Sequence, residues 1–151
     1  MKTEISSMDY CRHLGKWVKA SERFLYTPPE RPDLECYGTG YDSWGVQTNQ
    51  KAFAAFAVLA GRPESDLRKL GLSRAFLLEH ALKLLRFSLE SHLVGSFKCT
   101  DGKKWGNTWI SALGIERMMH GIESIEAHIE ANDRKLLKNV LISESDWLHN
   151  T

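Results

Sequence analysis

The sequence predicts an all-α fold made of antiparallel helical hairpins. Apolar residues recur at helical spacing in five segments, and Pro, Gly and capping residues bound these segments. No run of useful strand length alternates apolar and polar residues. A chain of 151 residues is the size of one domain, and such a domain buries about 70% of its unfolded surface. We therefore expect residues 1–151 to form a single all-α domain.

Two helices are expected in the first sixty residues. Helical spacing of apolar residues predicts the first over residues 7–25, and the proline-rich segment 27–32 ends it. The second covers residues 48–60 and is followed by Gly61. Its stretch 52–60 is apolar on all sides, so this helix should lie at the centre of the fold.

Two further helices are expected after residue 70. One covers residues 73–94 and has Ser73 as its N-cap. The other covers residues 109–130, and either Asn107 or Thr108 is its cap. Both carry an apolar stripe, which predicts that each packs one face against the core.

The last expected helix covers residues 133–148 and is capped by Asn132. The turn before it is short, which predicts an antiparallel hairpin with the preceding helix. In that preceding helix, Gly114 and Gly121 lie two turns apart on one side. Each costs about 1 kcal/mol of helix propensity relative to alanine, so close approach of a neighbouring helix is the expected compensation.

The connections before the second and fourth expected helices are long and rich in tryptophan, glycine and amides. Because antiparallel neighbours alternate in direction, these two helices should be parallel, and both loops should reach the same end. A long loop and a helical hairpin recur with a period near sixty residues, from Trp44 to Trp105. Hairpins of this period build α/α toroids. About five helices would form only a partial toroid, so we expect the N-terminal arc of a longer protein.

Composition disfavours several functional classes. The net charge of +1, from 20 basic and 19 acidic side chains, argues against nucleic acid as a partner. No apolar run reaches the roughly 18 residues of a membrane span, and no secretory signal opens the chain, so a cytoplasmic protein is expected. Cys11, Cys36 and Cys99 have unrelated spacings, which predicts reduced thiols rather than a disulfide framework or a metal site. No cofactor is expected.

The two long loops carry the residue types of a carbohydrate-binding surface. Indole rings offer flat apolar faces to the C–H faces of sugars, and amide or charged side chains pair with hydroxyl groups. The candidate binding residues are Trp44, Gln47, Asn49, Asp101, Lys104, Trp105 and Trp109. The alternative is structural, because a tryptophan at a helix start commonly closes the core. Asn107 can likewise be only a helix cap.

Candidates for catalysis are fewer. The reference pKa of histidine suits His120 for proton transfer, although such a histidine more often forms a hydrogen bond within the core. Asp42 and Asp101 would suit glycoside hydrolysis if they formed a carboxylate pair.

Residues 37–50 and 100–117 together resemble the N-terminal part of bacterial heparinase II/III-like proteins. These are polysaccharide-lyase relatives with an α/α toroid followed by a β-rich region. The resemblance implies β-elimination at a uronic acid. Asn107 or Gln47 would neutralise the carboxylate, and Tyr41 or His120 would transfer protons. The chain departs from the family in lacking the β-rich part and an export signal, which favours an oligosaccharide inside the cell as substrate.

Two other functions are compatible with the sequence. One is a non-catalytic helical module whose tryptophan-bearing end docks another protein, and the other is a glycoside hydrolase of the toroid type. The expected partners are a carbohydrate ligand and, on an uncovered helical flank, a second copy or the C-terminal portion of a longer chain.

Overall fold

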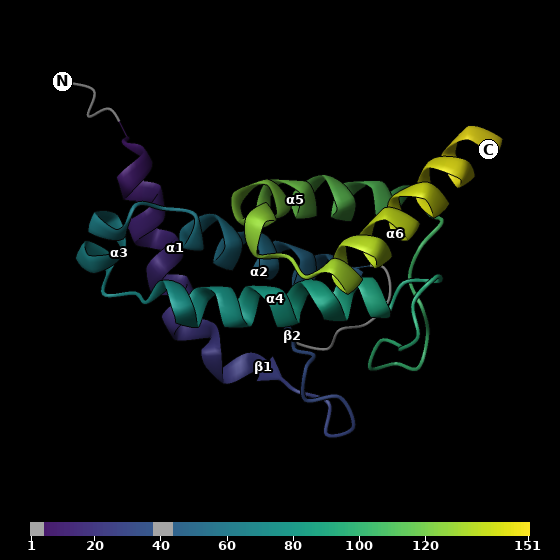
Figure 1. The fold of residues 1–151 in the computed structure, drawn as a ribbon, viewed down its shortest axis with the longest axis horizontal. Helices are drawn as coiled ribbons and strands as arrows, with labels where there is room; N and C mark the ends of the chain where they lie inside the picture. Colours follow the sequence, from purple (N-terminus) through teal and green to yellow (C-terminus); the bar gives the residue numbers. More distant parts are fainter. Residues whose placement is uncertain (1–4, 38–43) are drawn as a thin grey trace.

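The computed structural model describes residues 5–37 and 44–151. Within them the chain is predominantly helical, as predicted, and its helices are arranged around a central one (Figure 1). The α-helices are α1 Ser7–Ser21, α2 Trp44–Ala60, α3 Glu64–Leu70, α4 Arg74–Glu90, α5 Trp109–Ile125 and α6 Ala131–Asn150. Short 3₁₀ helices η1 Glu22–Phe24 and η2 Glu126–His128 follow α1 and α5, and strands β1 Leu25–Tyr26 and β2 Cys36–Tyr37 pair antiparallel.

Helix α2 is central, as its apolar composition predicted. It packs against α1, α4 and α5, and Phe53 and Phe56 are fully buried. Helices α2 and α4 are antiparallel: Arg74 Nε is 3.1 Å from the Ala60 carbonyl oxygen at one end, and Asn49 reaches α4 near the other. Residues 52–60 of this helix are buried or half-buried, which explains why that stretch has no polar face.

Helices α2 and α5 are parallel and unusually close. Gln47 Nε2 is 3.5 Å from the Ile110 carbonyl oxygen near their N-termini. A Cβ atom at Gly121 would lie 2.7 Å from Phe53 Cε1, and one at Gly114 would overlap the amide of Gln50. The two glycines therefore allow the close approach that the sequence predicted, and the N-termini of both helices lie at the same end of the molecule.

The ends of α2 and α4 differ from the prediction. Helix α2 begins at Trp44, one turn before residue 48. Helix α4 has Ser73 as its N-cap, as expected, but ends at Glu90 rather than at residue 94. There the Phe97 amide donates to the Glu90 carbonyl oxygen at 2.9 Å, and the chain turns back on itself.

The caps of the last two helices are also partly corrected. Thr108 is the N-cap of α5 and forms a capping box with Ser111, whereas Asn107 has φ 54° and lies before the cap. Helix α5 ends at Ile125 and continues only as η2. Helix α6 begins after Glu130, so Asn132 lies inside its first turn instead of capping it.

Helix α3 was not predicted, although its signals are present in the sequence. Pro63 precedes its first residue, and Gly71 follows its last with φ 64°, which is the usual left-handed stop. Seven residues are too few to show an apolar period, so the segment reads as a loop.

Helix α6 packs against α4 and does not form the expected close hairpin with α5. Arg86 of α4 holds Asp133 in the first turn of α6, with Nη2–Oδ2 at 2.8 Å and Nε–Oδ1 at 3.0 Å. This hydrogen-bonded pair raises the pKa of Arg86 above its ordinary value. The start of α6 is thereby drawn onto α4, and the helix crosses α5 at an angle instead of lying along it (Figure 1).

The cysteine thiols are reduced and buried. Burial raises the pKa of Cys36 to about 12. At about pH 8 only about one thiol in ten thousand would then be ionised, and the thiolate is the reactive form. We expect an aromatic disulfide reagent to modify Cys36 more than about a hundredfold more slowly in the folded protein than in denaturant. Rapid labelling of Cys36 with an unchanged circular dichroism spectrum would contradict this.

Among the described residues, no helix has both the length and the apolar character required to cross a bilayer.

Candidate functional site

Trp105 anchors the loop between α4 and α5 in the core. Its indole Nε1 donates to the Ser88 carbonyl oxygen at 2.8 Å, and its ring meets His92 edge-on with centroids 4.6 Å apart. The residue is almost fully buried. Its ring and its donor are thus engaged in packing, which leaves little of the residue exposed to a ligand.

A buried carboxylate holds the same loop from the side of α6. Glu144 Oε1 lies 2.8 Å from His92 Nε2 and 2.6 Å from the backbone nitrogen of Asn107. The Val94 amide donates to His92 Nδ1 at 3.1 Å, so Nε2 carries the proton and donates to Glu144. Gly106 has φ 133°, and a Cβ atom there would lie 2.5 Å from His92 Nε2, which leaves room for glycine alone.

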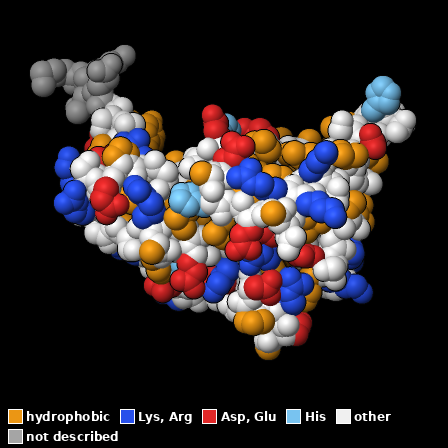
Figure 2. Space-filling view, in the orientation of Figure 1, with side chains coloured by type: hydrophobic (Ala, Val, Ile, Leu, Met, Phe, Trp, Pro, Cys, Tyr) orange, Lys and Arg blue, Asp and Glu red, His pale blue; other side chains and the backbone are white. Residues whose placement is uncertain are grey.

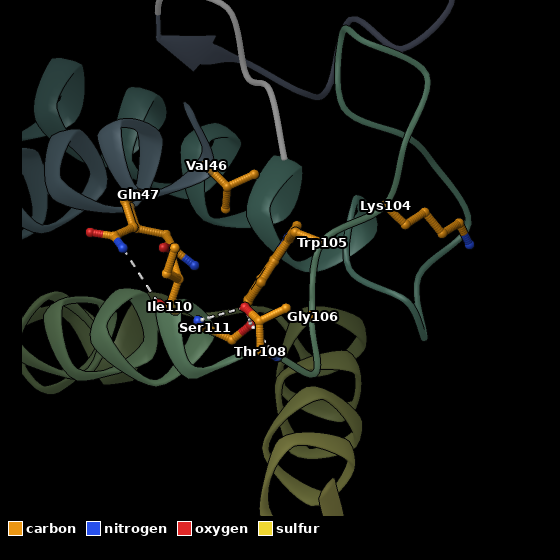
Figure 3. A pocket seen from close by; sticks show the side chains of 9 residues that line it. Val46, Gln47, Lys104, Trp105, Gly106, Thr108, Ile110 and Ser111 are labelled. Atoms are coloured by element: carbon orange, nitrogen blue, oxygen red, sulfur yellow. Dashed lines mark hydrogen bonds between the residues drawn. The ribbon is translucent and has the colours of Figure 1, made fainter. Parts of the chain in front are cut away.

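A small polar pocket of about 50 Å³ opens between the first turns of α2 and α5 and the loop before α5 (Figure 3). It has room for a few waters or one polar substituent, and is much smaller than the roughly 300–1,000 Å³ of a pocket that encloses a whole ligand. Its lining residues are Val46, Gln47, Gln50, Lys104, Trp105, Gly106, Thr108, Ile110 and Ser111.

Among the described residues that line the pocket, Gln50 has a buried side-chain donor without an acceptor. It is only 1% exposed, and its Nε2 has no acceptor within the described part of the chain. A buried amide donor without a partner costs about 1–3 kcal/mol. An oxygen atom entering the pocket would remove this cost, and the hydroxyl groups of Thr108 and Ser111 lie on the same pocket.

Trp44 and Trp109 form an exposed aromatic pair at the same end. Their ring centroids are 6.4 Å apart at an interplanar angle of 83°, and the residues are 63% and 65% exposed. They come from the first positions of α2 and α5, so the parallel arrangement of these helices brings them together. We call this pair together with the polar pocket the rim.

The other candidate binding residues are placed differently. Gln47 lines the pocket, with its Oε1 3.1 Å from Arg117 Nη1. Asn49 is completely buried. Its Oδ1 accepts from the backbone amide of Tyr37, and its Nδ2 donates to the Leu84 carbonyl oxygen and the Ser88 hydroxyl of α4. In this position Asn49 has no exposed surface for a ligand. Lys104 donates to the Gly95 carbonyl oxygen at 2.6 Å, and its ammonium group points away from the pocket (Figure 3).

Of the candidate catalytic residues that the structure describes, Asn107 lies beside the rim and His120 lies away from it. His120 is exposed on α5 beside Glu116, and lies eleven residues after Trp109, which is about 16 Å along the helix axis. Asp101 is exposed in the loop, where it accepts from the Lys103 amide at 3.1 Å. Asn107 lies next to the pocket and has a buried Oδ1 without a partner among the described residues. Tyr41, like Asp42, lies outside the described residues.

Sequence reasoning missed that Thr108 and Ser111 border the pocket. The amides of Gln47 and Gln50 suit sugar hydroxyl groups, and their spacing already places them together, because residues three apart share one face of a helix. Thr108 and Ser111 were readable as a capping box, although this motif alone does not reveal that its hydroxyl groups border a pocket. In the described part of the chain, no group of three or more His, Cys, Asp or Glu is arranged to hold a metal ion.

Comparison with protein-family models, with curated proteins and with solved structures finds no match to this chain.

Proposed function

We propose that the protein binds a carbohydrate at the rim. The observation that supports this most strongly is the combination of an exposed tryptophan pair and, flanking it, a pocket with an unpartnered amide donor. Exposed aromatic rings offer apolar faces, and the pocket offers hydrogen bonds at a fixed position. A sugar has both kinds of surface, since its C–H face is bordered by hydroxyl groups.

The size of the pocket limits what enters it. About 50 Å³ fits one substituent of a sugar, while the ring itself stays outside against an indole. Because Gln50 Nε2 is a donor, the substituent must present an oxygen acceptor. A carboxylate is the stronger acceptor and a hydroxyl the weaker one, so a uronic acid is the preferred sugar.

For the complete protein we propose β-elimination at a uronate as the reaction, on the strength of the resemblance described above. A base removes the C5 proton, the C4–O bond breaks, a C4–C5 double bond forms, and the leaving oxygen is protonated. An amide that donates to the carboxylate stabilises the negative charge that develops during proton removal. Gln50 and Gln47 are the amides that line the pocket.

We propose in addition that the helices form part of an α/α toroid. The parallel pair α2 and α5, with α4 antiparallel to α2 outside it, is compatible with the inner and outer layers of a partial α/α toroid. In such an arrangement the N-termini of the inner helices would line one edge, where the rim lies.

The binding proposal predicts specific losses. Trp44→Ala and Trp109→Ala should each weaken binding of a uronate-containing oligosaccharide by about 1–3 kcal/mol, the range for stacking of a flat ligand on an aromatic ring. Titration calorimetry with a panel of acidic and neutral oligosaccharides measures this. Phe24→Ala is the matched control, because Phe24 is an exposed aromatic outside the rim.

Two further outcomes separate binding from reaction. Equal affinity in wild type and both tryptophan variants would contradict binding at the rim. Elimination creates a conjugated uronate, which absorbs in the ultraviolet. Binding without any rise in absorbance across the acidic panel would keep the binding proposal and contradict the lyase.

A further inference from the structure

An apolar groove separates helix α6 from α5 and η2. It encloses about 420 Å³, and its apolar lining is Ile122, Ile129, Leu137, Leu141 and Ile142. Ile142 is 48% exposed although it is a large hydrophobic residue. The groove exists because α6 packs onto α4 and crosses α5 at an angle, and hydrophobic side chains are exposed between the two helices (Figure 2).

The apolar surface extends beyond the groove along both helices. On α5, Met119 is half-exposed and lies one turn before Ile122. On α6, Leu148 is exposed and lies two turns after Leu141, on the same side of the helix. A continuous apolar stripe of this kind usually marks an interaction surface.

The charged residues beside this stripe are ordered so that they complement those of a second, antiparallel copy of α6. Lys138 lies four residues before Ile142 and Asp146 four residues after it, and both line the groove. Neither has a salt bridge within the described ranges, 5–37 and 44–151. By contrast, Arg134 in the same groove already pairs with Glu126 at 3.7 Å.

We propose that the α5–α6 groove is a dimer interface in which α6 of a second copy lies antiparallel to α6, with the two-fold axis near Ile142. An antiparallel helix reverses the order of its charges. Lys138 then faces Asp146 of the partner subunit, and the symmetry repeats this pair on the other side of the axis. The apolar stripes meet in the middle, and the two ion pairs fix the register.

Helix α6 of a second copy can reach the groove. The C-terminal half of α6 projects from the body of the molecule (Figure 1). It can therefore enter the groove of a second copy while its own groove receives the partner's helix. The second copy covers the apolar stripe with an identical stripe, as an isologous interface requires.

Sedimentation velocity over a range of concentrations tests the dimer. We expect the wild type to dimerise and Ile142→Glu to weaken dimerisation by more than about tenfold, because a buried carboxylate without a partner opposes association. Asn139→Glu is the matched control on the same helix, since Asn139 is exposed but does not line the groove. Thermal melting of each variant shows that it remains folded.

A charge exchange tests the antiparallel register. Lys138→Glu alone and Asp146→Lys alone should each weaken the dimer, because each places like charges opposite one another twice. The double variant restores opposite charges and should recover dimerisation to near the wild-type level. A monomeric wild type at all concentrations would overturn the proposal, as would a dimer that Ile142→Glu leaves intact or a double variant no better than the single ones.

Discussion

Replacing Asp133 by alanine should lower the free energy of unfolding by about 3–5 kcal/mol, the range for removing one partner of a buried ion pair. Asp133 is almost fully buried, and its carboxylate receives the guanidinium of Arg86 through both oxygens. Among the described residues, the exposed Glu130 is then the remaining salt-bridge partner of the guanidinium. Since a domain is stable by only about 5–15 kcal/mol, the loss would be a large part of the total.

Urea unfolding followed by circular dichroism measures the effect, and two further variants identify its cause. Asp133→Asn keeps an oxygen acceptor for Arg86 and should cost less than the alanine variant. Joint replacement of Arg86 by methionine and Asp133 by leucine removes both charges and should recover much of the loss. A difference below about 1 kcal/mol between Asp133→Ala and wild type would show that the pair is not part of what holds α6 on α4.

The longer helices were predictable because their signals are local. The all-apolar stretch of α2 and the cap at Ser73 predicted a central helix and a helix start, and both are present. Gly114 and Gly121 predicted a close neighbour, and α2 is that neighbour. Such signals depend on residues within two or three turns of one another, so no knowledge of the fold is needed to read them.

The departure of α6 from α5 was not predictable in this way. A short turn favours a hairpin, but Arg86 and Asp133 are far apart in sequence, and nothing local indicates that they pair. The same limit applies at the candidate site. Trp105 and Trp109 look alike in sequence, yet one is buried under His92 and the other is exposed. Which indole faces solvent depends on where the loop before α5 is anchored.

Glu144 anchors the loop before α5, and Glu144→Ala should lower the free energy of unfolding by about 2–5 kcal/mol. Its Oε1 accepts from both His92 Nε2 and the Asn107 amide, and each buried donor left unpaired costs about 1–3 kcal/mol. The cavity left by the missing side chain adds to this. Urea unfolding measures the loss, and Glu144→Gln is the matched control because its Oε1 can still accept both bonds.

Glu144→Ala should also weaken binding at the rim. Asn107 and Gly106 precede the cap of α5, so release of their anchor should loosen the loop beside Gln50 and Trp109. We therefore expect Glu144→Ala, studied below its melting temperature, to bind oligosaccharide more weakly than Glu144→Gln. Asp133→Ala is the comparison that excludes a general effect of instability, because Asp133 holds the other end of α6 and touches no residue of the rim. If both alanine variants lose affinity equally, the loss reflects weakened packing of α6 as a whole. If only Glu144→Ala loses it, the carboxylate positions the loop for binding.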